Sequence, residues 1–516
     1  MKKIVILDLS KDINFLIKDS LVFHLSYGQA KLHNCKILNK NFFSQTKFEK
    51  FSKKINNTLF NFYNYLIKNK SKNEILTLEL FNIRNDKNQF YNKMYYLFEL
   101  IKFIKTKKIK HIEIITDDDD FYYTYKSIKI KNLIVHNFCK RKNLSFLNYF
   151  LKIIFFHIKS LIVIIFSKLY KPQNSIKTKL NEACLSIFPL FYKKEKHFFY
   201  NKDYLKFNFL LTDETHLGNS LIKNIITLKK LRKIENLISV ESFVDIKSLI
   251  ANLFKSIDNY KLIKKAFSNK FEINNINFSK QFFFLFFNSL INFNKLNIYD
   301  SALDNLKKKI KINKFHYYLF EYNFGYFLNR LIRKKSKNIE LIGYQHGIYS
   351  ERIMWQNLSK KIDFKSFFPD KIICKYNFSY ISYKKNFKNS FIKLKKNNQK
   401  TIPKTFNKKK GGGYDVFLGL HDCYNMVNEL RNLKTDKNFQ IYLHPKIKYR
   451  NILDLSKNLI FRHQTSNNKR KKILSSTSTI PYQLYLKEKF YIMKPNNIIP
   501  LNPKVLDKYF FDMKNK

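Results

Sequence analysis

Short apolar runs alternate with longer helical patterns over the first 140 residues of the chain. The segments KIVILDL, EILTLEL, HIEIITDD and NLIVHNF each predict a short buried strand. Residues 89–106 have the spacing of an amphipathic helix and lie between the second and third of these strands. Because this rhythm is typical of a parallel, doubly wound sheet, we expect a Rossmann-like unit over residues 1–145.

The C-terminal part of the chain repeats the rhythm. The segments YDVFLGL, FQIYLHP, KKILSST and FYIMKP predict strands, and residues 424–433 and 480–488 predict helices. A lysine-rich stretch that ends in three consecutive glycines precedes them, and such glycines are unfavourable inside a helix or strand. We expect a linker over residues 384–413 and a second Rossmann-like domain over 414–516.

The middle of the chain is mainly helical in pattern from residue 180 to 335, and the strands IELIGYQHG and PDKIICKY follow. We expect residues 176–383 to contain a helical insertion and to complete the N-terminal domain. A chain of 516 residues is too long for one compact core. The fold prediction is therefore α/β, with two Rossmann-type domains that face a cleft and a helical insertion in the N-terminal half.

Residues 146–170 form the most apolar part of the chain. Lys152, His157 and Lys159 interrupt the run, so it has no uncharged stretch of the ~18–20 residues that span a bilayer. We favour a helix in residues 146–175 that lies in the membrane interface, with its lysines extended to the headgroups. A buried helix and a spanning helix are the alternatives.

The formal net charge of +60 reflects 98 Lys and Arg residues against 38 Asp and Glu residues. These basic residues are spread along the whole chain without a recognisable nucleic-acid-binding motif. We expect no nucleic-acid partner, and the charge suits an anionic membrane surface, a polyanionic product or nucleotide substrates equally well. The five scattered cysteines lack a CxxC pair, and the first apolar run meets Asp8 too soon for a signal peptide. These features favour a reducing cytoplasm.

Four polar segments follow predicted strands, at the end where open α/β sheets bind ligands. A Ser/Thr cluster that opens a helix offers hydroxyls, backbone N–H groups and the positive end of the helix dipole, which together favour phosphate. His444 can donate to a phosphate oxygen or protonate a leaving group, and Pro445 fixes the backbone behind it. YLHPK and SSTST follow two consecutive predicted strands, which favours a shared site. The four segments are Gln345-His346-Gly347, His444-Pro445, SSTST (475–479) and KPNNIIPLNP (494–503).

Each segment also has an ordinary interpretation. A Ser/Thr cluster before a helix is commonly an N-cap, and a histidine between two glycines can pack beneath a turn. The run TDDDD at 116–120 follows a predicted strand, so it could bind a ligand or a metal ion there. We favour its interpretation as a solvated loop that caps the next helix.

Residues 315–510 resemble bacterial surface-carbohydrate biosynthesis proteins, relatives of capsule-type and polysialyl- or Kdo-type transferases with the GT-B fold. The resemblance rests on YLFEYNFGYFLNRLI, LIGYQHG, PDKIIC, YLHPK, STSTIPYQLYL and NNIIPLNP. It implies that His444, Thr477 and Ser478 hold the phosphate of a nucleotide-activated sugar, with Ser476 close by. Asn497 would border the same pocket.

The resemblance also implies a catalytic base on the other side of the cleft. His346, placed by tight turns at Gly343 and Gly347, could take the proton of the acceptor hydroxyl or bind the donor phosphate. Glu321, in a predicted helix, is the second candidate for the base. The helix after the hydroxyl cluster departs from the family, because Tyr482 and Gln483 replace an acidic residue and Lys487 replaces a glycine.

The expected activity is that of an inverting glycosyltransferase that needs neither a metal ion nor a cofactor. The donor would be a nucleotide-sugar, with a CMP-linked acidic sugar favoured. The acceptor would be a lipid-linked saccharide or lipopolysaccharide, at the cytoplasmic face of a bacterial inner membrane. One alternative is a polyol-phosphate transferase of the CDP-glycerol type. The other is a non-catalytic scaffold of a polysaccharide assembly complex, which the departures at 482, 483 and 487 would suit.

Overall fold

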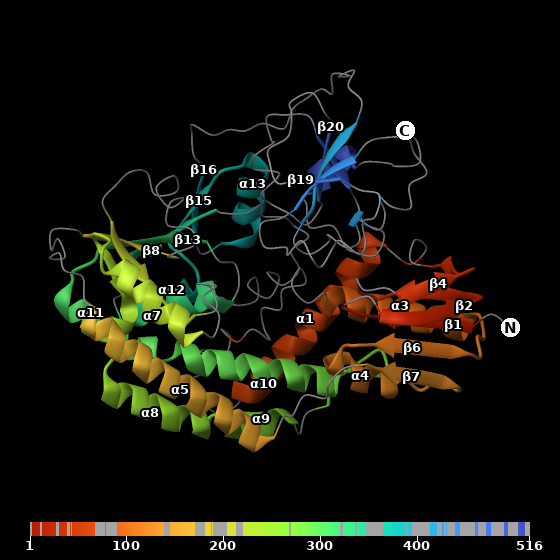
Figure 1. The fold of residues 1–516 in the computed structure, drawn as a ribbon, viewed down its shortest axis with the longest axis horizontal. Coiled ribbons are helices and arrows are strands. Elements are labelled where there is room, and N and C mark those ends of the chain that lie inside the picture. Colours follow the sequence, from red (N-terminus) through yellow and green to blue (C-terminus); the bar gives the residue numbers. More distant parts are fainter. Residues whose placement is uncertain are drawn as a thin grey trace.

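In the described part of the chain, a computed structural model contains three large parallel sheets with helices packed around them (Figure 1). The protein is therefore α/β, as the sequence predicts. In this view the N-terminal sheet lies at the right, the central sheet at the left and the C-terminal sheet above. The structure describes residues 3–10, 13–26, 30–38, 42, 44–67, 78, 90–138, 145–170, 181–186, 188, 204–212, 220–267, 270–319, 323–335, 338–345, 365–388, 390–394, 413–419, 426–427, 430, 439–443, 460–462, 471–475, 490–493 and 504–510.

The N-terminal sheet has the strand order β5-β3-β1-β6-β7, and all its pairs are parallel. Its first strand lies in the centre, the next two extend the sheet on one side, and the last two extend it on the other. The predicted strands β1, β6 and β7 and the predicted helix α3 are confirmed, whereas EILTLEL falls outside the described residues apart from Leu78. The strands are β1 (Lys3–Asp8), β3 (Ser20–His24), β5 (Lys36–Ile37), β6 (Ile112–Thr116) and β7 (Leu133–Asn137).

The central sheet has seven parallel strands in the order β10-β9-β8-β13-β14-β15-β16. This corrects the expectation that residues 176–383 mainly form a helical insertion that completes the N-terminal domain. Strands in this range build a sheet of their own, separate from the N-terminal sheet. The predicted strands β14 and β15 are confirmed, whereas β8, β10, β13 and β16 were missed, and each of the missed strands has only three to five residues. The strands are β8 (Glu182–Ser186), β9 (Leu205–Asn208), β10 (Leu237–Ser239), β13 (Lys314–Tyr318), β14 (Glu340–Tyr344), β15 (Lys371–Cys374) and β16 (Phe391–Leu394).

The C-terminal sheet has the order β19-β18-β17-β20-β21 and is also parallel. Four of its strands match the prediction, and β19 was missed. The predicted linker starts too early, because α13 ends and β16 lies within its first residues. The predicted helices at 424–433 and 480–488 lie largely or wholly outside the described residues. The strands are β17 (Tyr414–Phe417), β18 (Phe439–Tyr442), β19 (Ile460–Arg462), β20 (Lys471–Ser475) and β21 (Phe490–Met493).

Helices lie in many of the described connections between the parallel strands, as is usual for crossover connections. Several begin at a side-chain cap, for example Ser145 before α5 and Asp245 before α8. They are α1 (Gln45–Ile67), α3 (Phe90–Thr106), α4 (Asp119–Lys126), α5 (Phe146–Leu169), α7 (Leu221–Leu231), α8 (Ile246–Asp258), α9 (Tyr260–Phe267), α10 (Ser279–Leu296), α11 (Tyr299–Lys309), α12 (Asn323–Lys335) and α13 (Asn377–Asn386). The short elements are η5 (Val240–Phe243), η8 (Lys365–Phe367), η10 (Lys504–Tyr509), the pair β2 (Ile13–Lys18) and β4 (Ala30–His33), and the pair β11 (Glu272–Ile273) and β12 (Ile276–Asn277).

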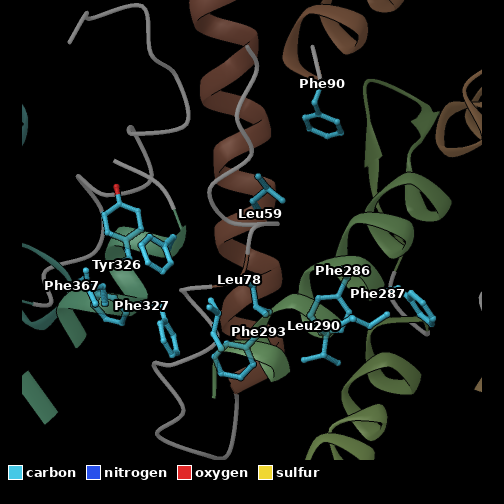
Figure 2. Close-up of a cluster of buried hydrophobic side chains, with 14 of the residues drawn as sticks. Leu59, Leu78, Phe90, Phe286, Phe287, Leu290, Phe293, Tyr326, Phe327 and Phe367 are labelled. Atoms are coloured by element: carbon cyan, nitrogen blue, oxygen red, sulfur yellow. The ribbon is translucent and has the colours of Figure 1, made fainter. Parts of the chain in front are cut away.

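One hydrophobic core joins the N-terminal and central units. Figure 2 shows Leu59 of α1 near Phe286 and Phe293 of α10, with Phe327 of α12 beyond them. Each side chain is almost completely buried, and burying one phenylalanine contributes roughly 1.5–3 kcal/mol. The C-terminal sheet has its own core, which includes Val416. The N-terminal and central units therefore stabilise each other through a common hydrophobic core. The C-terminal unit is stabilised mainly by packing within itself.

Candidate functional site

The site residues that the sequence predicts all lie outside the described residues. The strands that lead into them are described, so the structure fixes the starting points of the loops that carry them. The strand ends show which of the predicted residues follow strands that finish at the same edge of a sheet. The predicted residues are Glu321, His346, His444, Pro445, Ser476, Thr477, Ser478 and Asn497.

The two candidates for the catalytic base follow neighbouring strands of the central sheet. Tyr318 ends β13 and pairs in register with Tyr344, which ends β14. The Leu319 N–H donates a hydrogen bond of 2.9 Å to the Tyr344 carbonyl oxygen, which extends the pairing beyond both strands. Glu321 comes two residues after Leu319, and His346 two residues after Tyr344. Both loops therefore start from adjacent points at the carboxyl edge of one sheet. The described part of α12 begins at Asn323, and Glu321 itself lies outside the described residues.

Gly343 does not form the tight turn that the sequence predicts. It lies inside β14 and pairs in register with Tyr317 and Ile372 on either side. A side-chain carbon at Gly343 would lie 2.8 Å from Leu319 Cδ1 and 3.5 Å from Pro369 Cγ. Glycine therefore allows close packing here, since any larger residue would make the Leu319 side chain shift, while Gly347 falls outside the described residues.

Gln345 locks the end of β14 to the end of β15. Its side chain is buried, its N–H donates to the Ile373 carbonyl oxygen at 2.9 Å, and its Oε1 accepts from the Lys375 N–H at 2.8 Å. The residue directly before His346 is thus fixed by backbone and side chain alike. Sequence reasoning singled out the Gln-His-Gly segment but did not assign this role to its glutamine.

The candidate phosphate-binding edge belongs to the C-terminal sheet. The strand order places its reversal between β17 and β20, which is where open α/β sheets bind ligands. Buried Ser475 ends β20, and Ser476, Thr477 and Ser478 follow it directly. On the other side of β17, the Leu418 N–H donates to the Tyr442 carbonyl oxygen at 2.9 Å, two residues before His444.

The sequence suggests that the two motifs of this edge follow consecutive strands, but the structure shows that they do not. In the chain, β19 comes between β18 and β20, and in the sheet β17 lies between them. His444 and Ser476 therefore start on opposite sides of the central strand at the same edge. The spacing still allows a shared site, because β18 and β20 are two strand spacings, or about 10 Å, apart, and the phosphate and sugar of one donor could reach both segments.

The central and C-terminal units are in contact close to the carboxyl edges of their two sheets. Tyr376 lies two residues beyond β15, and its ring belongs to the same buried cluster as Leu474 of β20 and Ile492 of β21. Burial raises the pKa of the Tyr376 hydroxyl above its ordinary value, so this side chain stays neutral. The carboxyl end of β15, which pairs with β14, therefore adjoins the strand that leads into the hydroxyl cluster.

The corresponding edge of the N-terminal sheet is filled by an ion-pair network. Lys93 of α3 lies between Asp8, at the end of β1, and Asp118, just after β6, with Nζ–Oδ distances of 2.8 and 2.5 Å. The Tyr125 hydroxyl donates to Asp8 at 2.5 Å, and the Ser10 hydroxyl donates to Asp117 at 2.7 Å. These groups occupy the point at which the strand order of this sheet reverses.

The charges in this network depend on one another. Burial raises the pKa of the Asp8 carboxyl, and Lys93 lowers it only in part. Burial alone would lower the pKa of Lys93, but the carboxylates of Asp118 and Asp8 raise it above its ordinary value. Asp118 also accepts from the Asp120 and Phe121 N–H groups and so caps α4, which confirms the predicted helix cap. Across the described part of the chain, no group of three or more His, Cys, Asp or Glu side chains is arranged to hold a metal ion.

Two further buried polar groups escaped the sequence reasoning. Glu241, at the start of η5, accepts hydrogen bonds from the Leu210 and Leu211 N–H groups and from the Ser239 and Tyr299 hydroxyls. Burial raises the pKa of Glu241 above its ordinary value. It holds the loop that follows β9, and a lone glutamate in the apolar run LISVESF gave no signal of that role.

The second group is His316 on β13. Its ring nitrogens lie 3.1 Å from the Tyr344 hydroxyl and 3.2 Å from Glu182 Oε2, and its ring packs against Tyr204. Burial, followed by the charge of Glu182, raises the pKa of Tyr204 to about 12. This network ties β13 to β8 and β14 within the sheet, behind the edge from which the Glu321 and His346 loops start.

Comparison of the chain with protein-family models, with curated proteins and with solved structures gives no match. The strand ends, the residues that follow them and the contacts between the sheets are therefore the features that indicate a function.

Proposed function

We propose that the protein is a glycosyltransferase that moves a sugar from a nucleotide-activated donor to a cell-surface polysaccharide or lipopolysaccharide acceptor. One observation carries the proposal. Tyr376 and Leu474 share a buried cluster, so the edge that leads to His346 adjoins the edge that leads to Ser476–Ser478. A transferase needs such an arrangement, with a base on one side and a phosphate site on the other.

The donor would bind at the carboxyl edge of the C-terminal sheet. The hydroxyls of Ser476, Thr477 and Ser478 would hold the phosphate, helped by backbone N–H groups of the same loop. His444 would donate to the leaving phosphate oxygen, and Pro445 would fix its backbone. Asn497, in the loop after β21, would border the nucleotide. A CMP-linked acidic sugar is the favoured donor because of the resemblance to polysialyl- and Kdo-type transferases.

The acceptor would be activated at the carboxyl edge of the central sheet. Its hydroxyl oxygen would attack the anomeric carbon while the bond from that carbon to the phosphate oxygen breaks. His346 or Glu321 would take the hydroxyl proton, since both loops start from adjacent strand ends. A single displacement of this kind inverts the configuration at the anomeric carbon. The charge on the leaving phosphate would be stabilised by hydroxyls and N–H groups, so the step is proposed without a metal ion.

In this proposal the GT-B pair consists of the central and the C-terminal sheets. The residues between Tyr414 and Met493 would form the donor domain, and those between Glu182 and Leu394 the acceptor domain. The N-terminal sheet, which the sequence suggested as the partner, would be a third unit that packs on the acceptor domain. We propose that the enzyme works in the cytoplasm.

The proposal is tested by incubating the purified chain with CMP-, CDP- and UDP-activated donors and a lipid-linked saccharide acceptor. We expect release of CMP and a glycosylated acceptor. Either His346→Ala or Glu321→Gln should lower kcat by roughly 10²–10⁴-fold, which identifies the base. Transfer of a polyol phosphate from a CDP donor would instead assign a polyol-phosphate transferase. Nucleotide binding without turnover of any donor would assign a scaffold.

A further inference from the structure

Helix α5 has two apolar faces, and only one of them is covered by the protein. Seven apolar residues recur along it at spacings of three and four, and at 100° per residue they fall within an arc of about 80°. Six of them are exposed and the seventh, Ile162, is half-buried. They are Leu147, Leu151, Phe155, Ile158, Ile162, Ile165 and Leu169.

The opposite face of α5 is held inside the protein by polar contacts. The Tyr149 hydroxyl donates to the Ser256 carbonyl oxygen at 2.7 Å and accepts from the Asn294 side chain at 2.7 Å. His157 Nε2 lies 3.3 Å from the Asn252 side chain. Moving α5 across a bilayer would break these contacts and expose α8 and α10, so the structure disfavours a spanning helix. The exposed stripe equally disfavours a fully buried one.

Neighbouring helices add to the exposed apolar surface. Both α7 and α8 pack against α5, and α5 and α8 run together along the lower border of Figure 1. Ile222 and Ile226 are exposed on α7, and Ile250 and Phe254 are exposed on α8. Scattered exposed apolar residues are ordinary, but a set concentrated on three adjoining helices marks an interaction surface.

Lysines accompany this surface, and carboxylates are scarce. Lys152 and Lys159 flank the α5 stripe on one side and Lys168 flanks it on the other, by the same helical geometry. Asp258 is the sole acidic residue in α5, α7 and α8, whereas every one of these helices contains lysines. Apolar residues flanked by lysines are typical of helices that lie in the interface of an anionic membrane.

The lysines also indicate whether a membrane or a second copy of the chain covers this surface. Two copies that pair through this surface would bring lysine-rich rims together, and like charges across an interface oppose association. An anionic bilayer complements the lysines and accepts the apolar stripe at once. We propose that α5, α7 and α8 form a docking surface that lies in the interface of a membrane rich in anionic phospholipid. This inference holds whether or not the protein transfers a sugar.

The test is co-sedimentation of the full chain with vesicles of phosphatidylcholine, with and without phosphatidylglycerol. The wild type should bind the vesicles that contain phosphatidylglycerol, and added salt should weaken this binding. Lys152→Gln with Lys159→Gln should lower the affinity for these vesicles by roughly fivefold for each lysine. Wild-type protein that stays in the supernatant with both kinds of vesicle would overturn the proposal without any variant.

A matched pair of double variants tests the apolar stripe. Phe155→Gln with Ile158→Gln should lower binding by roughly tenfold or more. The control is Phe391→Gln with Ile381→Gln, because Phe391 and Phe155 are both 66% exposed and β16 and α13 lie away from α5 in Figure 1. Equal binding of the two double variants would contradict the proposal. A dimeric wild type that only the α5 variant converts to a monomer would assign the surface to a second copy.

Discussion

The N-terminal and C-terminal sheets have the same topology but differ at the edge where ligands bind in such folds. In each, the first strand is central, two strands follow on one side and two on the other. In the N-terminal sheet Lys93 pairs with Asp8 and Asp118 at the reversal point. In the C-terminal sheet β20 runs at that point into a cluster of serines and threonines.

Two sheets of the same topology can therefore differ in whether they offer a binding site. At the N-terminal reversal point the ion pairs link α3 to the ends of β1 and β6, and a phosphate would have to displace Asp8 and Asp118 from their lysine. A reversal point followed by hydroxyls and N–H groups has donors for an anion. The central sheet has the same order with two more strands, and its carboxyl edge is tied by Gln345 rather than by charges.

The largest expected effect on stability concerns the carboxyl edge of the N-terminal sheet, which the ion-pair network fills. Lys93→Met leaves the carboxylates of Asp8 and Asp118 without their cation, and should lower the free energy of unfolding by about 3–5 kcal/mol. Chemical denaturation measures this loss. Lys3→Met is the control, because Lys3 is 41% exposed in its 2.7 Å pair with Glu113, and should lose less than about 1 kcal/mol. Similar losses for both variants would show that the network is not a buried one.

The next effect concerns the carboxyl edge of the central sheet. Gly343→Ala places a methyl group against Leu319, which is itself buried, and should lower the free energy of unfolding by about 1–3 kcal/mol. The loss should shrink when Leu319→Val is present as well, because the shorter side chain frees space. A double-mutant cycle by chemical denaturation measures this coupling. Additive losses would mean that the two residues do not collide.

A smaller effect on stability is expected at Gln345, the residue directly before His346. Gln345→Ala removes the acceptor of the Lys375 N–H and should lower the free energy of unfolding by about 1 kcal/mol. Hydrogen exchange should show the Lys375 amide exchanging roughly fivefold faster. Gln440→Ala, where the amide accepts a longer bond of 3.4 Å from Tyr442, is the control and should leave the Lys375 amide unchanged. Unchanged exchange in Gln345→Ala would contradict the assigned role.

The smallest effect concerns Glu241. This buried carboxylate is held by neutral hydrogen-bond donors, whereas Asp8 is paired with a lysine. Because the pKa of Glu241 is raised in the folded protein, the folded state binds a proton more tightly than the unfolded state. The wild type should therefore gain stability relative to Glu241→Gln as the pH falls through the window from the raised pKa to the ordinary one. Thermal melts across that window measure the difference. A difference that stays constant with pH would contradict the assigned pKa direction.

The sequence predicted the strands that are apolar and precede a clear polar segment, such as β1, β6, β14, β17 and β20. It missed β10, which has three residues, and β13, where His316 interrupts the apolar pattern. Pattern reasoning therefore treated the central unit as helical. Register also lies beyond a single sequence, because the pairing of Tyr318 with Tyr344 brings together strands separated by a helix. The function of Gly343 depends on the position of Leu319, which no local pattern reveals.

The central claim is that a nucleotide binds at the reversal point of the C-terminal sheet and not at that of the N-terminal sheet. Isothermal titration of CMP, CDP and UDP tests it on the wild type, on the double variant His444→Ala, Ser478→Ala, and on Ser10→Ala. Ser10→Ala removes an exposed hydroxyl at the filled edge and serves as the matched control. We predict that CMP binds the wild type and Ser10→Ala alike and that the double variant does not bind it. Folded wild-type protein that binds none of the three, or a double variant that binds CMP unchanged, would contradict the account.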